Sequence, residues 1–256
     1  MNEGRSGSTT VVGRNPVREA LDDSSIEIEK VLIKQGAGGS SISEIRRLAH
    51  ERGVPVQFVP VNKLDRLAAG ASHQGVAAVT SPVPYLDLND VLQAIAPDRE
   101  SVNTSKPILL LLDGIQDPHN FGAILRSAVA ADVAAVIVPR HGMAPVSSVT
   151  VKASAGTAGR IPLARVGNLG NTLYELKERG FWIAGADGLG ETSMWEMDWD
   201  RPLAIVIGSE GKGLSRRVAD ECDYRVRIPI SERAESLNAS VAAGILLFVA
   251  TRPRLH

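Results

Sequence analysis

Three loops in the second half of the chain combine glycine with polar side chains that can bind ligands or move protons. The first covers residues 112–128 and holds Asp113, Asp117, Pro118, Asn120 and Arg126. With Pro118 near its start, a helix here offers free backbone N–H groups and a positive dipole end, which suit a phosphate or another polar ligand group. Asn120 and Arg126 are separated by about 600° of helix, so they do not share a face. One can point into a pocket while the other anchors the loop.

The other two loops follow later apolar strands. Residues 207–215 carry three glycines in a short bend, which permits positive φ angles and close backbone approach to a bound molecule. Glu210 in this bend is either a solvent-exposed side chain or a ligand contact. In residues 228–240, Ser236 is placed to cap the final helix, with Asn238 inside its first turn. None of the three loops identifies a reaction by itself.

Common nucleotide-binding and catalytic fingerprints are not met. Residues 36–41 are glycine-rich, but Ser41 replaces the third glycine of the dinucleotide-binding pattern. Residues 208–215 begin like a phosphate-binding P-loop, yet Leu214 stands where that loop needs a lysine. The histidines show no metal-ligand spacing, and no serine-hydrolase elbow is present. We therefore expect no ATP hydrolysis, no bound metal and no protease or esterase chemistry.

The elements around these loops alternate between strands and helices. Uninterrupted apolar runs, typical of strands buried on both faces of a parallel sheet, occur at residues 108–112, 134–138, 181–186, 203–207 and 224–228. Helical spacing occurs at residues 120–131, 169–179 and 237–251. This pattern predicts an open α/β sheet with helices on both faces. Ligands of such sheets bind beyond the carboxyl ends of the strands, where the loops after Leu112, Ile207 and Ile228 lie.

The first half of the chain predicts a smaller α/β domain over residues 9–83. Strands are expected at residues 30–33, 54–59 and 75–79, with a helix around residues 42–49, and their alternation indicates a largely parallel sheet. Residues 1–8 lack an apolar pattern and are expected to form a flexible tail. Prolines and a polar run indicate a linker over residues 84–107. Residues 108–256 would then form the second domain.

The composition limits the class of protein. The 256 residues contain 28 Lys plus Arg against 29 Asp plus Glu, a formal net charge of −1, so bulk attraction to nucleic acid is not indicated. Basic pairs such as Arg46-Arg47 leave a local patch open. Because Cys222 is the only cysteine, an intrachain disulfide cannot form, and a reducing cytoplasm fits best. No apolar run reaches the roughly 20 residues that cross a bilayer, and no secretory leader is recognisable, so no membrane partner is expected.

Taken together and in this order, the three loops resemble the three motifs of the SpoU (TrmH) class of SPOUT methyltransferases. The first motif corresponds to Asp113, Asp117-Pro118, Asn120, Gly122 and Arg126. The second corresponds to residues 207–213, and the third to Ile228-Pro229 with residues 236–240. This resemblance covers residues 108–256. Residues 12–21 and 73–77 resemble the RNA-binding domain, similar to ribosomal protein L30e, of the 23S rRNA guanosine-2′-O-methyltransferases.

The resemblance implies a fold and an activity that periodicity does not reveal. Members of the class use S-adenosylmethionine to methylate a ribose 2′-hydroxyl in RNA. The resemblance implies an α/β fold in which the C-terminal parallel sheet makes a deep trefoil knot that binds the cofactor. It also implies a homodimer whose active sites are completed across the interface. These properties are expectations for this chain.

Site residues are carried over position by position from the motifs. Gly208, Ile228 and Leu237 would hold the cofactor. Arg126 would be the catalytic residue, with Asn120 and Glu210 shaping its surroundings and Ser236 and Asn238 lining the site near the methyl group. The candidate RNA contacts are Arg14, Asn15, His73 and Gln74. A guanidinium normally stays protonated, so Arg126 is better suited to pair with the target phosphate and stabilise the developing alkoxide than to act as the base.

The leading functional hypothesis is methylation of a guanosine in 23S rRNA. Enzymes of the same superfamily that act on tRNA, or on an rRNA adenosine to confer antibiotic resistance, are the alternatives. An RNA-binding assembly protein without catalysis is an alternative of another class. That alternative predicts damage at the motif positions, but Asn120, Arg126, Glu210 and Asn238 are all present.

Overall fold

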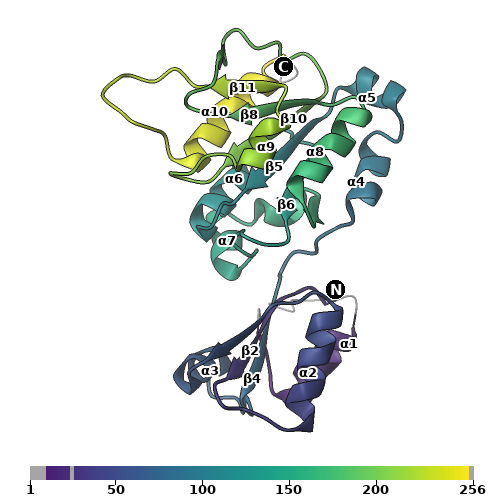
Figure 1. Cartoon of the computed structure of the whole chain (residues 1–256), viewed down its shortest axis with the longest axis vertical. Helices are drawn as coiled ribbons and strands as arrows, with labels where there is room; N and C mark the ends of the chain where they lie inside the picture. Colours follow the sequence, from purple (N-terminus) through teal and green to yellow (C-terminus); the bar gives the residue numbers. More distant parts are fainter. Residues whose placement is uncertain (1–9, 24–25, 254–256) are drawn as a thin grey trace. The chain divides into compact units, whose positions relative to one another are not determined.

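The computed structural model describes residues 10–23 and 26–253, so the tail expected over residues 1–8 lies outside the described residues. One compact unit ends at Pro84 and a second begins at Tyr85, residues 145–148 excepted (Figure 1). Each unit has its own sheet and is treated separately below.

In its described residues, the N-terminal unit contains four strands and three helices. Their order is β1 (Thr10–Val12), α1 (Arg14–Asp22), β2 (Ile28–Lys34), α2 (Ser40–Glu51), β3 (Val56–Val59), α3 (Val61–Ala68) and β4 (Val76–Thr80). The strand order in the sheet is β1-β4-β2-β3. Only β2 and β3 pair in parallel, while β4 runs antiparallel to both β1 and β2. The expectation of a largely parallel sheet was therefore wrong, because β4 enters the sheet in the opposite direction after α3.

Alternation along β2 divides the core of this unit between the two faces of the sheet. Val31 and Ile33 pack with α1 and α2, whereas Leu32 packs with Leu64 of α3 and with Val59. Successive side chains of a strand point to opposite faces, so one apolar strand supports both helical layers.

Residues 85–107 differ from the expected linker. They form α4 (Leu88–Ile95) and α5 (Arg99–Ser105), and Leu88, Leu92 and Val102 are buried in the core of the second unit. Leu86 makes a parallel bridge with Ala164 at the edge of the large sheet. The prolines that suggested a linker lie between short helices and strands, where each ends the element before it. They do not mark an unstructured connection.

The second unit is built on a seven-stranded sheet with the order β7-β6-β5-β10-β8-β11-β9. Its strands are β5 (Ile108–Asp113), β6 (Ala135–Pro139), β7 (Leu163–Val166), β8 (Trp182–Ala186), β9 (Thr192–Ser193), β10 (Leu203–Gly208) and β11 (Tyr224–Arg227). Every neighbouring pair is parallel. The predicted open parallel sheet is confirmed, and the carboxyl ends of β5, β10, β8 and β11 lie next to one another.

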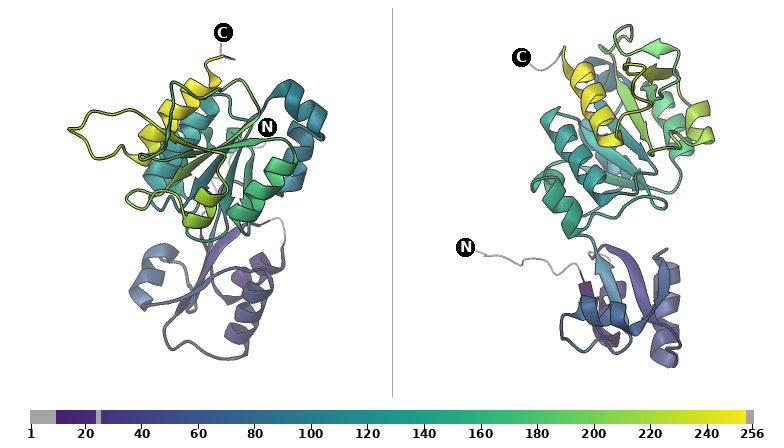
Figure 2. Two further views of the ribbon diagram at one scale, coloured as in Figure 1. Left: turned by 45° about the horizontal axis from the view of Figure 1, so that its top comes forward. Right: turned by 90° about the vertical axis from the view of Figure 1, so that its left-hand side faces the viewer.

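Helices cover both faces of this sheet (Figure 2). They are α6 (Pro118–Ala130), α7 (Ser148–Ala153), the 3₁₀ helix η1 (Thr157–Arg160), α8 (Leu169–Glu178), α9 (Arg216–Asp220) and α10 (Ala239–Thr251). Side chains of α4, α5, α8 and α9 share one core with the sheet, while α6 and α10 pack against each other. Over the described ranges, no helix has the length and apolar character needed to span a membrane.

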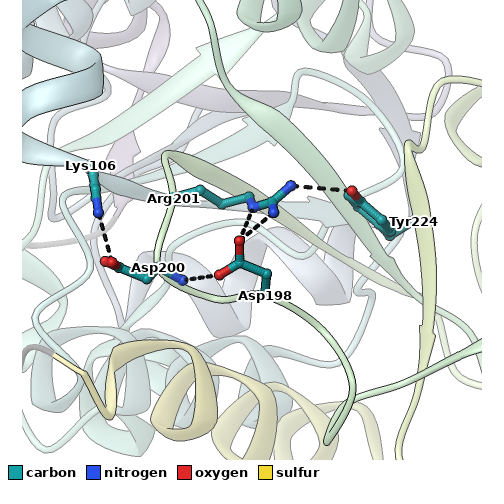
Figure 3. A network of polar contacts seen from close by, with 5 residues as sticks. All are labelled: Lys106, Asp198, Asp200, Arg201 and Tyr224. Carbon is teal, nitrogen blue, oxygen red and sulfur yellow. Dashed lines mark hydrogen bonds and ion pairs between the residues drawn. The ribbon is translucent and has the colours of Figure 1, made fainter.

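Charged side chains form hydrogen bonds and ion pairs along the amino edge of the large sheet. Arg201, just before β10, donates to the carboxylate of Asp198 and, over 3.1 Å, to the hydroxyl of Tyr224 in β11 (Figure 3). Lys106, just before β5, pairs with Asp200 at 2.7 Å. The hydrogen bond from Arg201 lowers the pKa of Asp198. These contacts connect the entries of three strands.

Candidate active site

Three residues from the three motif loops meet at the carboxyl edge of the large sheet. The Nδ2 of Asn120 donates to Oε1 of Glu210 over 2.9 Å. The Nδ2 of Asn238 donates to the same oxygen over 2.6 Å and to Oδ1 of Asn120 over 3.0 Å. Residues separated by up to 118 positions thus form one hydrogen-bonded cluster, hereafter the Asn-Glu-Asn cluster.

The start of α6 places Asn120 in this cluster. Asp117 is the N-cap residue, and its carboxylate accepts a hydrogen bond of 2.8 Å from the N–H of His119. Pro118 follows at the first helical position, where its missing N–H costs nothing. Asn120 therefore lies in the first turn, half-buried, with its amide directed to Glu210.

Gly122 fixes how closely α6 approaches α7. A methyl group at this position would lie 2.5 Å from the Cβ of Ala153 and 2.5 Å from the carbonyl oxygen of Thr150. Glycine is thus required by the close packing of the two helices and not by its backbone angles.

The start of α10 places Asn238. Its side-chain oxygen accepts hydrogen bonds from the N–H groups of Ser240 and Val241, so Asn238 is the N-cap residue. The expectation that Ser236 caps this helix was wrong, because the helix begins two residues later. Ser236 is exposed and does not line the cavity described below.

The loop after β10 is a tight turn that presents Glu210. Ser209 and Gly213 exchange backbone hydrogen bonds of 3.0 and 2.9 Å. A Cβ on Gly208 would lie 2.3 Å from the carbonyl carbon of Gly213, so no side chain fits there. The carboxylate of Asp113 accepts a hydrogen bond of 2.7 Å from the N–H of Ser215, which fixes the end of the turn to β5.

Asn120 and Glu210 of the Asn-Glu-Asn cluster line a cavity of about 290 Å³. Its lining residues are Gly114, Ile115, Gln116, Asp117, Asn120, Ser209, Glu210, Lys212 and Ala239. The N–H of Ala239, in the first turn of α10, lies 3.4 Å from Oε1 of Glu210, where a helix N-terminus favours negative charge. The cavity therefore offers a carboxylate held by amide donors, next to the exposed ammonium of Lys212.

Arg126 is not brought into this cavity. It lies on α6, its side chain is exposed, and it has no hydrogen bond or ion pair with any residue in the ranges 10–23 and 26–253. The predicted angular separation of Arg126 from Asn120 agrees with this placement. Within one chain, therefore, the predicted catalytic arginine neither lines this cavity nor bonds to the Asn-Glu-Asn cluster.

Two of the predicted cofactor residues lie at or just after the ends of strands, and the third lies just before a helix. Gly208 ends β10, Ile228 follows β11, and Leu237 precedes α10. Ile228 and Leu237 are half-buried, while residues 229–236 between them are exposed and form the long connection from β11 to α10 (Figure 1). Because β8 lies between β10 and β11, the three residues lie at the same edge of the sheet but do not belong to two neighbouring strands.

Sequence reasoning missed a fourth loop at this edge, the segment after β8. The guanidinium of Arg227 donates to the carbonyls of Gly190 and Glu191 over 3.0 and 2.6 Å. Asp187 accepts hydrogen bonds from the N–H of Leu189 and from Arg225. The signal was available, because polar and glycine residues directly follow the predicted strand at 181–186.

The predicted RNA contacts cluster at one end of the N-terminal sheet. The Nε of Arg14 donates to the carbonyl of Gln74 over 3.1 Å, and the Oε1 of Gln74 accepts from the N–H of Arg14 over 3.3 Å. His73 accepts a 2.9 Å hydrogen bond from the N–H of Gly75 on Nδ1, and its Nε2 lies 3.0 Å from Asp65. Asn15 is exposed next to Arg14. Residues 60 positions apart are thus brought together.

The described residues show neither a reactive thiol nor a metal site. The thiol of Cys222 donates to the carbonyl of Val218 over 3.2 Å, and burial raises its pKa to about 11. No group of three or more His, Cys, Asp or Glu side chains in the described part of the chain is arranged to hold a metal ion.

Comparisons with known proteins agree with the motif assignment. The SpoU rRNA Methylase family matches residues 107–248, more than half of the chain, and the family described as RNA 2′-O ribose methyltransferase substrate binding matches residues 10–86. A protein of Staphylococcus haemolyticus (strain JCSC1435) that is named for the TrmH family of tRNA/rRNA methyltransferases is 43% identical over 244 residues, 95% of each chain. A similarly named Staphylococcus aureus (strain MSSA476) protein is 43% identical over 246 residues, 96% of each chain.

Two solved structures extend the similarity to the fold. The rRNA methyltransferase of Sinorhizobium meliloti with bound AdoMet has a TM-score of 0.61 and 26% identity, covering 97% of this chain and 88% of that one. The SpoU methyltransferase AviRb of Streptomyces viridochromogenes, in complex with AdoMet, has a TM-score of 0.60 and 26% identity, covering 96% and 90%. With the motif loops meeting at one edge of a parallel SPOUT-type sheet, the chain belongs to the SpoU (TrmH) family of RNA methyltransferases.

Proposed function

We propose that this chain methylates a ribose 2′-hydroxyl of RNA, at a guanosine of 23S rRNA, with S-adenosylmethionine as methyl donor. The observation that carries the proposal is the Asn-Glu-Asn cluster, which joins three motif loops at one sheet edge. An inactive RNA-binding protein of this fold would have no need to keep these side chains bonded around a cavity.

The carboxyl edge fits the cofactor that the similar solved structures contain. Gly208 leaves the turn after β10 free of side chains, so its backbone can approach a ligand. Ile228 and Leu237 offer half-buried apolar surface to an adenine ring and ribose. The cofactor supplies an electrophilic methyl carbon, so the protein needs no nucleophile of its own. In this assignment Gly208, Ile228 and Leu237 bind and orient it.

The remaining residues position and polarise the sugar. Methyl transfer would be an in-line displacement that requires alignment of oxygen, carbon and sulfur, and the hydroxyl would release its proton to solvent as the new bond forms. The Asn-Glu-Asn cluster fixes the wall of the cavity, with Ser236 and Asn238 assigned near the methyl group. Arg126 stays protonated, pairs with the target phosphate and stabilises the developing alkoxide.

A homodimer is part of this proposal. Arg126 does not line the cavity of its own chain, so a second copy supplies it. Val241 and Phe248 on α10 are 48% and 49% exposed and lie on one stripe of the helix with the half-buried Ile245. Exposed apolar side chains at this spacing are typical of a helix that packs against a partner.

The remaining assignments concern the substrate and the chain path. The N-terminal unit, expected over residues 9–83, binds RNA through Arg14, Asn15, His73 and Gln74, and residues 108–256 carry out methyl transfer. The non-sequential order of β5, β10, β8 and β11, followed by the return of α10 to α6, supports the trefoil knot. Since rRNA is the substrate, the place of action is the cytoplasm.

The test is methylation of separate RNA pools. The protein is incubated with methyl-labelled S-adenosylmethionine and with unmodified transcripts of 23S rRNA or tRNA, and the labelled nucleotide is mapped. We expect one 2′-O-methylguanosine in 23S rRNA. Label in tRNA or at an adenosine would overturn the substrate, and label on a base would overturn the reaction.

A further inference from the structure

The outer side of α2 and the strand β3 form a groove that the proposed function does not use. Its volume is about 530 Å³, within the size range of ligand sites. Residues of α2 spaced by three or four positions form one wall, and two valines, one just before β3 and one at its start, form the other. The lining residues are Ser43, Arg46, Arg47, His50, Val54 and Val56.

An exposed aromatic ring extends this groove. Phe58 is 50% exposed and lies on β3, which among the described residues is an edge strand paired with β2. Val56 and Phe58 are two positions apart in the strand, so they share the face that α2 covers. The guanidinium of Arg46 lies 5.8 Å from the centroid of the Phe58 ring. A ring with a guanidinium beside it is a surface on which a nucleobase stacks.

The charges at the groove favour an anionic ligand. Arg46 and His50 have no acidic partner among the described residues, while Arg47 pairs with Glu51 at 2.7 Å. Both members of that pair are exposed, so the pair contributes little and is readily exchanged for a phosphate. No acidic side chain is among the lining residues. This local excess of positive charge contrasts with the net charge of −1 of the chain.

The end of α2 carries an arginine with a structural role, in contrast to Arg46 and His50. Arg52, at the end of α2, donates to the carbonyls of Ala20, Leu21, Asp23 and Ile26, and so fixes the connection between α1 and β2. Arg46 and His50 make no such backbone contacts in the described part of the chain. Apart from the contact of Arg46 with the Phe58 ring, both side chains are exposed and can reach a ligand.

We propose that this groove binds an unpaired nucleotide of the RNA substrate, with its base stacked on Phe58 and its flanking phosphates on Arg47 and His50. Sequence-tolerant recognition of unpaired RNA uses this combination of an aromatic face and cations. The inference rests on the proposed function only in that the substrate is RNA. The groove belongs to other elements than the Arg14–Gln74 contact, so RNA touches the N-terminal unit in two places.

The experiment measures RNA affinity and methylation together in the full-length protein. Dissociation constants for unmodified 23S rRNA and tRNA transcripts are determined by filter binding for the wild type and for Phe58→Ala, Phe58→Trp, Arg46→Ala and Arg46→Lys. For the transcript that the wild type methylates, we expect Phe58→Ala to weaken binding about tenfold and Phe58→Trp to keep the wild-type affinity. Methylation at saturating RNA stays at the wild-type rate. The matched controls are Tyr174→Ala, an exposed ring on α8, and Arg66→Ala, an exposed cation on α3.

Cross-linking gives a second measurement that needs no variant. Ultraviolet irradiation of the wild-type complex should attach RNA to the tryptic peptide of residues 53–63, which contains Phe58. Unchanged RNA affinity in Phe58→Ala and Arg46→Ala, together with no cross-link to this peptide, would overturn the inference and leave the proposed function intact. A change of oligomeric state in Phe58→Ala without a change in RNA affinity would also overturn it, because β3 would then pair with protein. Loss of methylation with the wild type, at normal RNA binding, would overturn the proposed function alone.

Discussion

The two edges of the large sheet carry polar side chains for different purposes. At the amino edge, Arg201 bonds to Asp198 and Tyr224 and lies 4.8 Å over the ring of Trp182, so its donors are used within the protein. At the carboxyl edge, Glu210 accepts hydrogen bonds from two asparagines at the wall of a cavity.

This difference follows from the direction of the strands. All strands of the sheet are parallel, so every strand enters at one edge and ends at the other. Loops at the carboxyl edge of such sheets are free to form ligand sites. Substitutions at the carboxyl edge should therefore change methylation, and substitutions at the amino edge should change stability. Four variants test this division, beginning with the largest effect.

Arg126→Lys should lower the single-turnover rate of methylation by about 10³-fold, because an ammonium cannot form the paired, planar hydrogen bonds of a guanidinium with phosphate. Affinity for S-adenosylmethionine, measured by calorimetry, should not change, since Arg126 is assigned to the target phosphate of the RNA and not to the cofactor. A near-normal rate would remove Arg126 from the reaction.

Gly208→Ala should lower methylation by about 10²-fold by displacing the turn. The added methyl would lie 2.5 Å from the N–H nitrogen of Leu214, so the turn must open and weaken cofactor binding. Gly167→Ala is the matched control, because a Cβ there meets no atom within 4 Å. If calorimetry gives the two variants the same cofactor affinity, the turn is not part of the cofactor site.

Asn238→Ala should lower both methylation and stability. It is therefore an exception to the rule that substitutions at the carboxyl edge change methylation alone. Loss of the N-cap of α10 should cost about 1 kcal/mol in the free energy of unfolding, measured in urea. Methylation should fall about tenfold, because the Asn-Glu-Asn cluster loses one member. Ser236→Ala, two positions earlier, should leave the unfolding midpoint unchanged, and a drop equal to that of Asn238→Ala would contradict the assignment of the cap.

Asp198→Asn should have the smallest effect, and only on stability. The hydrogen bond from Arg201 lowers the pKa of Asp198 below its ordinary value of 3.8. The carboxylate therefore stabilises the fold above that pH, and the contribution is lost as the pH falls through the folded pKa. Because Asp198 is largely exposed, the variant should lose less than about 1 kcal/mol of unfolding free energy at pH 7. At a pH below the folded pKa of Asp198 it should lose nothing, and urea unfolding at the two pH values measures both. A changed methylation rate would contradict the division between the edges.

The large sheet was predictable because its strands are long apolar runs. The run at residues 108–112 is buried on both faces, which leaves a clear signal without any knowledge of its neighbours. The small sheet was less predictable, since apolar alternation does not reveal whether neighbouring strands are parallel. Short elements such as β1 and β9 give almost no periodic signal.

The candidate site was predicted in part. The meeting of Asn120, Glu210 and Asn238 followed from motifs placed after parallel strands. The cap of α10 was misassigned because Ser236 and Asn238 are both good N-cap residues, and only the helix start distinguishes them. The absence of Arg126 from the cavity lining agrees with the prediction from helix geometry that Arg126 and Asn120 do not share a face.

Gly122 limits how this enzyme can acquire new substrates. It lies between Asn120 and Arg126 on α6, and the backbone of Thr150 occupies the space beyond it. A side chain at this position would therefore push α6 away from α7 and shift Asn120 with it. Evolution or engineering of altered specificity must instead work through loop exchange and through the separate RNA-binding unit, with α6 kept as a fixed reference.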